Sequence, residues 1–147
     1  MENREIYSFR ILNSSVEMAY QAFENPNYLK NWWGPKGFTN TIHEFDLKPG
    51  GNWKLTMHGP DKGNYENYSV FETVIPNELV RWKRKSQPLF DMEIEFIKID
   101  NNKTKISFKM IFENADECSR IRKIVEPKNE ENFDRLVSVI QNMRTNL

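Results

Sequence analysis

The sequence predicts a single α+β domain, residues 1–147, in which an antiparallel sheet curls around a long C-terminal helix. Three observations predict this fold. A strand-like segment followed by two short helical segments opens the chain, alternating apolar and polar residues fill residues 38–112, and the last part repeats apolar residues at helical spacing. The 147 residues are also a common length for one domain with one core.

The N-terminal segment, residues 5–12, alternates between two faces and is expected to form the first strand. One face carries Ile6, Ser8 and Arg10, and the other carries Tyr7, Phe9 and Ile11. Two short helices are expected next. Ser14 and Glu17 have the spacing of a capping box at the start of the first helix, whose apolar stripe consists of Val16, Ala19, Tyr20 and Phe23.

Asn25-Pro26 ends the first of these helices and starts the second, because Asn caps helices well and Pro is favoured at the first helical position. The second helix is expected to carry Tyr28, Leu29, Trp32 and Trp33 and to end at Gly34-Pro35. For Trp32 and Trp33 two roles are open, a gate to a cavity or an anchor for this helix.

The middle of the chain predicts six consecutive antiparallel strands joined by short turns. They are expected at residues 38–47, 52–58, 65–75, 79–85, 92–96 and 106–112. The breaker Pro49-Gly50-Gly51 follows the first of them. A tight reversal there predicts a positive φ at Gly50 or Gly51, since glycine adopts this conformation without a steric penalty.

Two helical segments are expected at the C-terminal end. Asn114 is the expected cap of the first, residues 115–124, and Pro127 is expected to end it. The second, residues 129–143, is roughly 22 Å long at 1.5 Å per residue, which is enough to cross several strands. Its apolar face, which we expect to be buried against the sheet, consists of Phe133, Leu136, Val137, Ile140 and Met143.

Composition argues against several classes of protein. The 21 basic residues balance the 21 acidic ones, so no net field favours nucleic acid or an anionic membrane. The N-terminus lacks the apolar core of a signal peptide and no apolar run reaches 18 residues, so no membrane insertion is expected. The single Cys118 cannot form an intramolecular disulfide, and we therefore expect a cytoplasmic protein.

Five short motifs follow one another in a specific order along the chain. They are W-W-G-P at 32–35, F-D-L-K-P-G-G at 45–51, G-P-D-K-G at 59–63, F-E-T-V-I-P-N-E-L-V at 71–80 and N-F-D-R-L at 132–136. This set resembles the activator-of-heat-shock-protein-90-ATPase homologue family, which belongs to the START/Bet v 1-like (SRPBCC) superfamily. The resemblance covers about 13–143. It implies a helix-grip fold, in which the curved sheet and the C-terminal helix enclose an apolar cavity.

The chain departs from the family pattern at two places. Tyr68 stands where the family often has Gly, and Asn132-Phe133 replaces the common Gly-Trp. The second departure is expected to change the shape of the cavity mouth.

The candidate binding residues are those assigned to the inward faces of the strands and of the last helix. They are Trp53, Met57, Trp82, Met92, Ile94, Phe108, Met110, Phe133 and Val137. A ligand site would be concave and mostly apolar, as this set is, and Met adapts to irregular gaps. For each of these residues, plain core packing is the alternative role.

No residues point to a catalytic or metal centre by their spacing. Of the two histidines, His58 is expected to face solvent, whereas His43 shares its parity with Phe45 and can face inward. A surface position is the alternative for His43. The basic run 81–85 is expected to be a solvated strand face and not a nucleic-acid site, and Cys118 is expected to be a structural thiol.

The sequence therefore supports three functions, of which the first is preferred. The protein binds a hydrophobic or amphipathic small molecule without catalysis; or it is a cyclase- or hydrolase-like enzyme on the same fold; or it is a co-chaperone-type domain whose partner is a chaperone. No cofactor is expected. Both a monomer and a homodimer are compatible with the sequence. Fold alone does not choose among these functions, since one scaffold hosts many activities.

Overall fold

All seven strands within residues 3–145, the part of the chain that the computed structural model describes, form one antiparallel sheet. The strands are β1 (Glu5–Leu12), β2 (Thr39–Phe45), β3 (Asn52–His58), β4 (Asn64–Ile75), β5 (Leu79–Arg84), β6 (Asp91–Asp100) and β7 (Lys103–Ile111). Their order across the sheet is β1-β7-β6-β5-β4-β3-β2. Strands β2 to β7 thus form the predicted meander, and β1 adds to its far edge beside β7.

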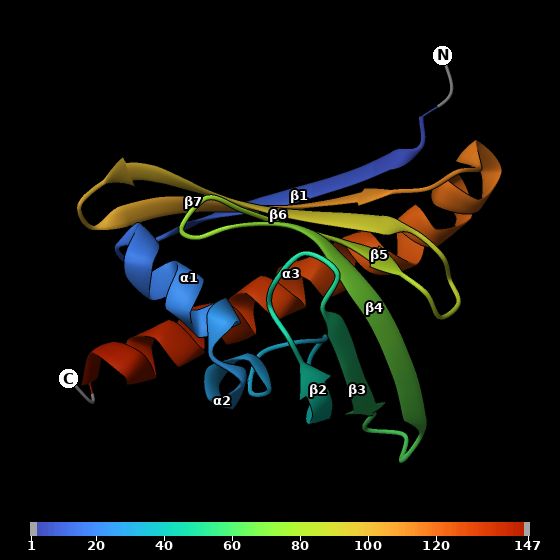
Figure 1. Cartoon of the computed structure of the whole chain (residues 1–147), viewed down its shortest axis with the longest axis horizontal. Coiled ribbons are helices and arrows are strands. Elements are labelled where there is room, and N and C mark those ends of the chain that lie inside the picture. Colours follow the sequence, from blue (N-terminus) through green and yellow to red (C-terminus); the bar gives the residue numbers. More distant parts are fainter. Residues whose placement is uncertain (1–2, 146–147) are drawn as a thin grey trace.

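The sheet curves around the C-terminal helix α3 (Ala115–Thr145). Figure 1 shows β1, β6 and β7 on one side of this helix, while β3 and β4 turn down past it. Two shorter helices, α1 (Val16–Glu24) and α2 (Pro26–Leu29), lie on the same side of the sheet as α3. This arrangement confirms the predicted helix-grip fold.

Alternation within the strands explains which side chains form the core. In β3, Trp53 and Leu55 are buried and Lys54 between them is exposed, and in β5 Val80 and Trp82 are buried between exposed or partly exposed neighbours. Helix α1 covers one end of the concave face, where the ring of Tyr20 packs edge-on against Phe96 of β6 with 5.3 Å between centroids. The inner face of the sheet is therefore apolar along most of its width.

The alternation in β1 also decides which of its two faces is the inner one. Ile6 and Ser8 are buried, whereas Tyr7, Phe9 and Ile11 are 44–51% exposed on the outer face. The Lys105 ammonium lies 4.7 Å from the centroid of the Phe9 ring. An apolar stripe is thus left in contact with solvent on the outside of the sheet.

The caps of the short helices differ in part from the prediction. The N-cap of α1 is Ser15, whose side chain accepts a hydrogen bond from the Met18 amide; the predicted cap, Ser14, is buried and donates to the Ser15 carbonyl oxygen instead. Asn25 caps α2 as predicted. Helix α2 is shorter than expected, and the two tryptophans lie in turns after it.

The C-terminal region is one helix of 31 residues, so the prediction that Pro127 separates two helices was wrong. Proline inside a helix removes one hydrogen bond and crowds the preceding turn. Pro127 and Lys123, whose carbonyl loses its helical partner, are both exposed, so water can solvate the unpaired group. Figure 1 shows the first part of α3, in orange, running at an angle to the rest. Burial of the face that includes Leu136 and Ile140 stabilises the continuous helix.

The turn between β2 and β3 needs both of its glycines. Gly50 has φ +84°, which confirms the predicted positive φ. A Cβ atom at Gly51 would lie 1.9 Å from the carbonyl oxygen of Asp46, because the chain folds back tightly on itself there. Backbone hydrogen bonds from Gly50 N to Phe71 O and from Phe71 N to Gly51 O fix the turn against β4.

Candidate functional site

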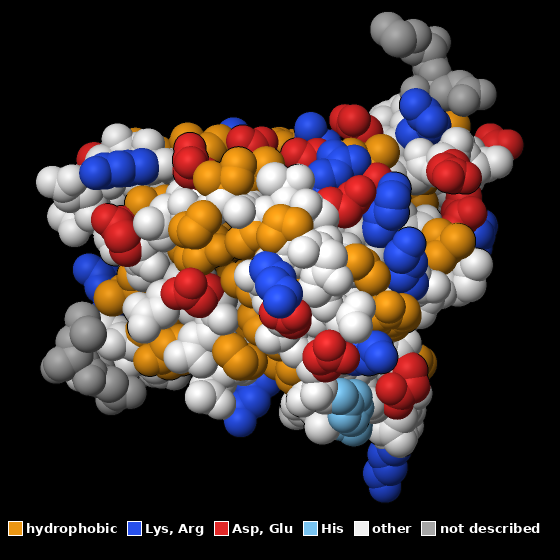
Figure 2. All heavy atoms as spheres, in the orientation of Figure 1, with side chains coloured by type: hydrophobic (Ala, Val, Ile, Leu, Met, Phe, Trp, Pro, Cys, Tyr) orange, Lys and Arg blue, Asp and Glu red, His pale blue; other side chains and the backbone are white. Residues whose placement is uncertain are grey.

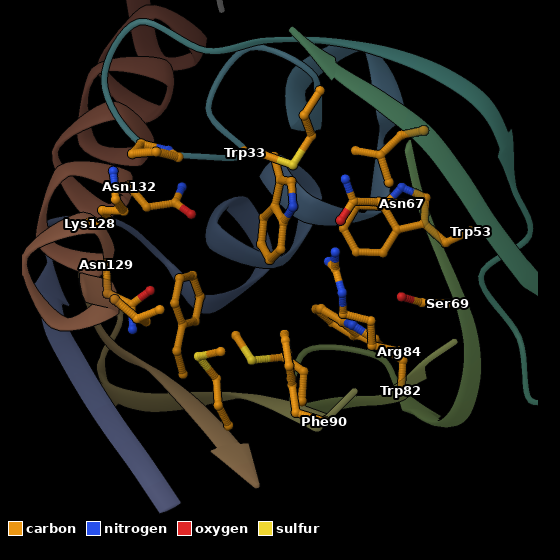
Figure 3. A pocket seen from close by; sticks show the side chains of 17 residues that line it. Trp33, Trp53, Asn67, Ser69, Trp82, Arg84, Phe90, Lys128, Asn129 and Asn132 are labelled. Atoms are coloured by element: carbon orange, nitrogen blue, oxygen red, sulfur yellow. The ribbon is translucent and has the colours of Figure 1, made fainter. Parts of the chain in front are cut away.

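A cavity of about 200 Å³ lies between the concave face of the sheet and the first half of α3. Its volume is below the roughly 300–1,000 Å³ of typical ligand sites, so it suits a small molecule or one apolar arm of a larger molecule. The apolar side of the lining consists of Trp33, Pro35, Trp53, Leu55, Met57, Trp82, Phe90, Met92, Phe108, Met110 and Val125. The polar side consists of Asn67, Ser69, Arg84, Lys128, Asn129 and Asn132. Figure 3 shows these side chains from close by.

The structure places most of the predicted binding residues at this cavity. Those that line it are Trp53, Met57, Trp82, Met92, Phe108 and Met110. Ile94 and Phe133 are fully buried core residues away from the lining, and Val137 is partly buried on α3. Phe133 instead supports the wall from behind, with its ring centroid 4.5 Å from that of Phe108.

The two adjacent tryptophans have different positions. Trp32 is fully buried and donates from Nε1 to the Ala22 carbonyl oxygen at 2.9 Å, so it anchors the loop to α1. Trp33 lines the cavity, and its ring centroid lies 5.1 Å from that of Trp53 and 5.8 Å from that of Trp82. The indole of Trp33 therefore forms part of the apolar wall (Figure 3).

Side chains of α3 hold this tryptophan loop in place. The Asn132 amide donates to the Trp32 carbonyl oxygen at 2.6 Å and accepts from the Gly34 amide at 3.3 Å. The Arg135 guanidinium donates to five backbone carbonyl oxygens, those of Asn31, Trp33, Gly34, Pro35 and Phe38. Burial lowers the pKa of Arg135. These contacts fix the position of one cavity wall relative to the helix.

Two charged residues, Arg84 and Lys128, line the cavity, and Arg84 is the less exposed of the two. It is half-buried, and its Nε and Nη2 donate to the carbonyl oxygens of Ser86 and Gln87, each at 3.1 Å. Its guanidinium carbon lies 5.6 Å from the centroid of the Phe90 ring. Burial lowers the pKa of Arg84 to about 10, so it remains protonated at neutral pH.

The polar residues of the cavity were not predicted from the sequence, although the alternation of the strands indicates that some of them face inward. Arg84 has the same parity as Val80 and Trp82, which the alternation of β5 turns inward. Asn67 and Ser69 likewise share the inward parity of Phe71 in β4. Trp33 and the residues of α3 give no such signal, because the turns after α2 and the bend of α3 set their positions.

The sequence of this chain matches the model of a known protein family over most of its length. A family model described as "Activator of Hsp90 ATPase homolog 1-like protein" matches residues 13–141. The chain belongs to this family. The predicted resemblance is thereby confirmed, and the matched residues include every strand from β2 to β7 and most of α3.

Several solved structures share this fold at low sequence identity. A protein from Nitrosomonas europaea is 17% identical, with 96% of each chain covered and a TM-score of 0.87. A protein from Arthrobacter aurescens is 16% identical over 95% of this chain and 87% of that one, with a TM-score of 0.86. The AHSA1 protein from Silicibacter pomeroyi is 14% identical over 95% of this chain and 99% of that one, with a TM-score of 0.78. At such identities the similarity shows the fold. None of the curated proteins matches the chain in sequence.

The histidines of this family member lie outside the cavity. His43 is exposed and its Nε2 lies 2.7 Å from Thr56 Oγ1, which donates to Glu66 at 2.7 Å on the outer face of the sheet. The inward orientation considered for His43 was wrong, because a bulge in β2 between Ile42 and Glu44 changes the alternation. Figure 2 shows histidine atoms, in pale blue, at the surface.

The structure also bears on the expectations about membrane insertion, metal binding, the basic run and Cys118. None of the helices within residues 3–145 is both long and apolar enough to cross a membrane. In that range no three side chains of His, Cys, Asp or Glu are grouped to hold a metal ion. Two residues of the basic run are paired with acids: Arg81 forms ion pairs with Asp91 at 2.9 Å and with Glu93 at 2.8 Å, and Lys83 lies 3.3 Å from Asp91. Cys118 is fully buried in α3.

Proposed function

We propose that the protein binds an apolar or amphipathic small molecule in the cavity between the sheet and α3, without catalysis. The observation that carries this proposal is the composition of the lining, in which tryptophans, phenylalanines and methionines surround a few polar groups. Ligand sites have this composition, because apolar burial supplies affinity and a few hydrogen bonds supply orientation. At about 25 cal/mol per Å², a ligand that buries roughly 150 Å² of apolar surface gains about 4 kcal/mol before the cost of association.

The residues around the cavity also support binding over catalysis. Among the described residues that line it, none is a histidine, a cysteine, an aspartate or a glutamate. General acid–base and nucleophilic catalysis mostly use these side chains with a partner in hydrogen-bond reach. The polar lining residues are better suited to orienting a ligand than to moving a proton.

The test is titration with Nile red, an uncharged dye whose fluorescence rises in an apolar environment. The wild-type protein should bind the dye and show quenching of its tryptophans, three of which line the cavity. Met110→Trp should fill the space and weaken dye binding at least tenfold. Ile124→Trp is the matched control, because Ile124 is 56% exposed on α3. A folded Met110→Trp protein with unchanged dye affinity would contradict the proposed site.

A second candidate function is that of a protein-binding domain, as the family description suggests. The apolar stripe of Tyr7, Phe9 and Ile11 on the outer face of β1 favours it, since large exposed side chains in a row often mark interaction surfaces. The test is the ATPase rate of Hsp90 measured with wild type and with Phe9→Ser. If this second function is correct, the wild-type protein should change the ATPase rate of Hsp90, and Phe9→Ser should change it less. An ATPase rate that does not respond to the wild-type protein would remove this candidate.

A further inference from the structure

We propose that the ligand of the cavity is a carboxylate-bearing amphiphile, whose carboxylate binds Arg84 and whose apolar part lies among the tryptophans and methionines. This inference rests on the proposed function and adds the chemical class of the ligand. Three features support it: the sign of the charges around the cavity, the free donors of Arg84, and a row of donors across three neighbouring strands.

The charges that line the cavity have one sign. Arg84 and Lys128 are both cationic, and no acid occurs among the lining residues within the described chain. The whole sequence, by contrast, contains equal numbers of basic and acidic residues, 21 of each. Lys128 is exposed on α3, so solvent screens it, whereas Arg84 is half-buried. A single negative charge on the ligand would therefore compensate the half-buried cation.

The guanidinium of Arg84 keeps donors available for such a group. A guanidinium has five N–H donors, and two of them are used by the carbonyl oxygens of Ser86 and Gln87. For the other three, the described residues provide no hydrogen-bond acceptor, and Figure 3 shows the nitrogens directed toward the middle of the cavity. The two acceptors in use are neutral, so the charge itself has no counterion among residues 3–145.

Arg84 is one end of a row of polar groups that crosses the sheet. Ser69 of β4 lies directly opposite Arg84 of β5, and Trp53 of β3 lies directly opposite Ser69. Residues in such positions have Cβ atoms about 4.5–5.5 Å apart. All three line the cavity. The row thus brings the backbone positions of Arg84, Ser69 and Trp53 side by side on one wall.

The row also contains one buried donor without a partner. Trp53 Nε1 is buried and has no acceptor within residues 3–145. Ser69 is 4% exposed. A buried donor without a partner is uncommon in proteins and often indicates a ligand or a water molecule. Donors without acceptors call for an acceptor-only group, and a carboxylate is such a group, with two oxygens that accept bidentate hydrogen bonds from arginine.

The effect of burial on the protonation of Arg84 also favours an anionic ligand. Burial lowers its pKa to about 10, which means that its surroundings disfavour the charged form. A bound carboxylate would reverse that effect. Because hydrogen bonds to charged groups are stronger than neutral ones, most of the selectivity for an acid over a matched alcohol should come from this contact.

The experiment compares sodium octanoate with 1-octanol, which has the same chain length and no charge. Each compound is titrated against Nile red bound to wild type, to Arg84→Gln and to Lys85→Gln. Lys85→Gln is the control, because the Lys85 side chain is exposed and does not line the cavity. Wild type and Lys85→Gln should bind octanoate at least tenfold more tightly than octanol. Arg84→Gln should lose about 10- to 100-fold in octanoate affinity and less than threefold in octanol affinity.

The outcomes separate this inference from the proposed function. Equal affinity of wild type for octanoate and octanol would overturn the inference while leaving the cavity a binding site. Failure of the dye and both probes to bind would overturn the proposed function and the inference with it. Should Arg84→Gln not fold, thermal unfolding of the wild-type protein provides the same test. Octanoate should raise Tm more than octanol at equal concentration, and equal shifts would overturn the inference.

Discussion

Arg135 donates a hydrogen bond from Nη1 to the carbonyl oxygen of Gly34 at 2.8 Å, although the two residues are 101 positions apart. The same guanidinium reaches four other carbonyl oxygens of the loop that contains Trp33. Since Trp33 lines the cavity, this contact connects the sequence of α3 to the shape of the candidate site. The helix therefore closes the concave face of the sheet and also positions one wall of the cavity.

The first prediction follows from this contact. Arg135→Met should lower the free energy of unfolding by about 2–4 kcal/mol, because five carbonyl oxygens lose a charged donor. It should also weaken Nile red binding, because the loop with Trp33 loses its support. Urea unfolding and dye titration measure the two effects. Arg120→Met, at an exposed position of the same helix, is the control and should change neither. Dye affinity that stays at the wild-type value would show that Arg135 does not position the wall.

The second prediction tests the packing of α3. Leu136 is fully buried, so Leu136→Ala should lower the free energy of unfolding by about 2–5 kcal/mol. The exposed Ser138 on the same helix provides the comparison, and Ser138→Ala should change stability by less than about 0.5 kcal/mol. Denaturant unfolding followed by tryptophan fluorescence measures both. A loss below about 1 kcal/mol for Leu136→Ala would contradict the helix-grip arrangement.

The third prediction separates two reasons for glycine in one turn. Gly50 has a positive φ but open space around its missing Cβ, so Gly50→Ala should cost only the conformational penalty of about 1–2 kcal/mol. Gly51→Ala should cost more, because its Cβ would lie 1.9 Å from the Asp46 carbonyl oxygen and the backbone must move. Thermal unfolding of the two variants gives their order. A Gly50→Ala variant less stable than Gly51→Ala would contradict this account.

Local sequence patterns were sufficient for most of the fold. Alternation predicted the strands, because one face of each strand is buried and the period of two is visible without knowledge of the partner. The glycines of the β2–β3 turn were predictable for the same reason, since their conformation is a local property. Pro127 was not, because whether a helix continues past a proline depends on how much surface its two halves bury elsewhere.

Less of the candidate site than of the fold could be predicted from the sequence. Strand parity brings Trp53 and Trp82 to the concave face, but it does not tell a packed core position from a cavity wall. Arg84 shares that parity, yet its basic neighbours favour a solvated surface. The contact between Asn132 and Trp32 joins residues 100 positions apart and leaves no local pattern. The bulge that turns His43 outward is equally invisible, because it depends on the pairing of β2 with β3.

The last prediction concerns the proline inside α3. Pro127 is exposed, and it removes one backbone hydrogen bond from a helix that is otherwise continuous. Pro127→Ala should therefore raise the free energy of unfolding by about 1–3 kcal/mol. The substitution should also straighten the helix next to Val125, Lys128 and Asn129, which line the cavity, and so change the affinity for Nile red. Glu126→Ala, at the adjacent exposed position, is the control and should leave dye affinity unchanged. A variant Pro127→Ala that is less stable than wild type would mean that the bend itself is required for α3 to pack on the sheet.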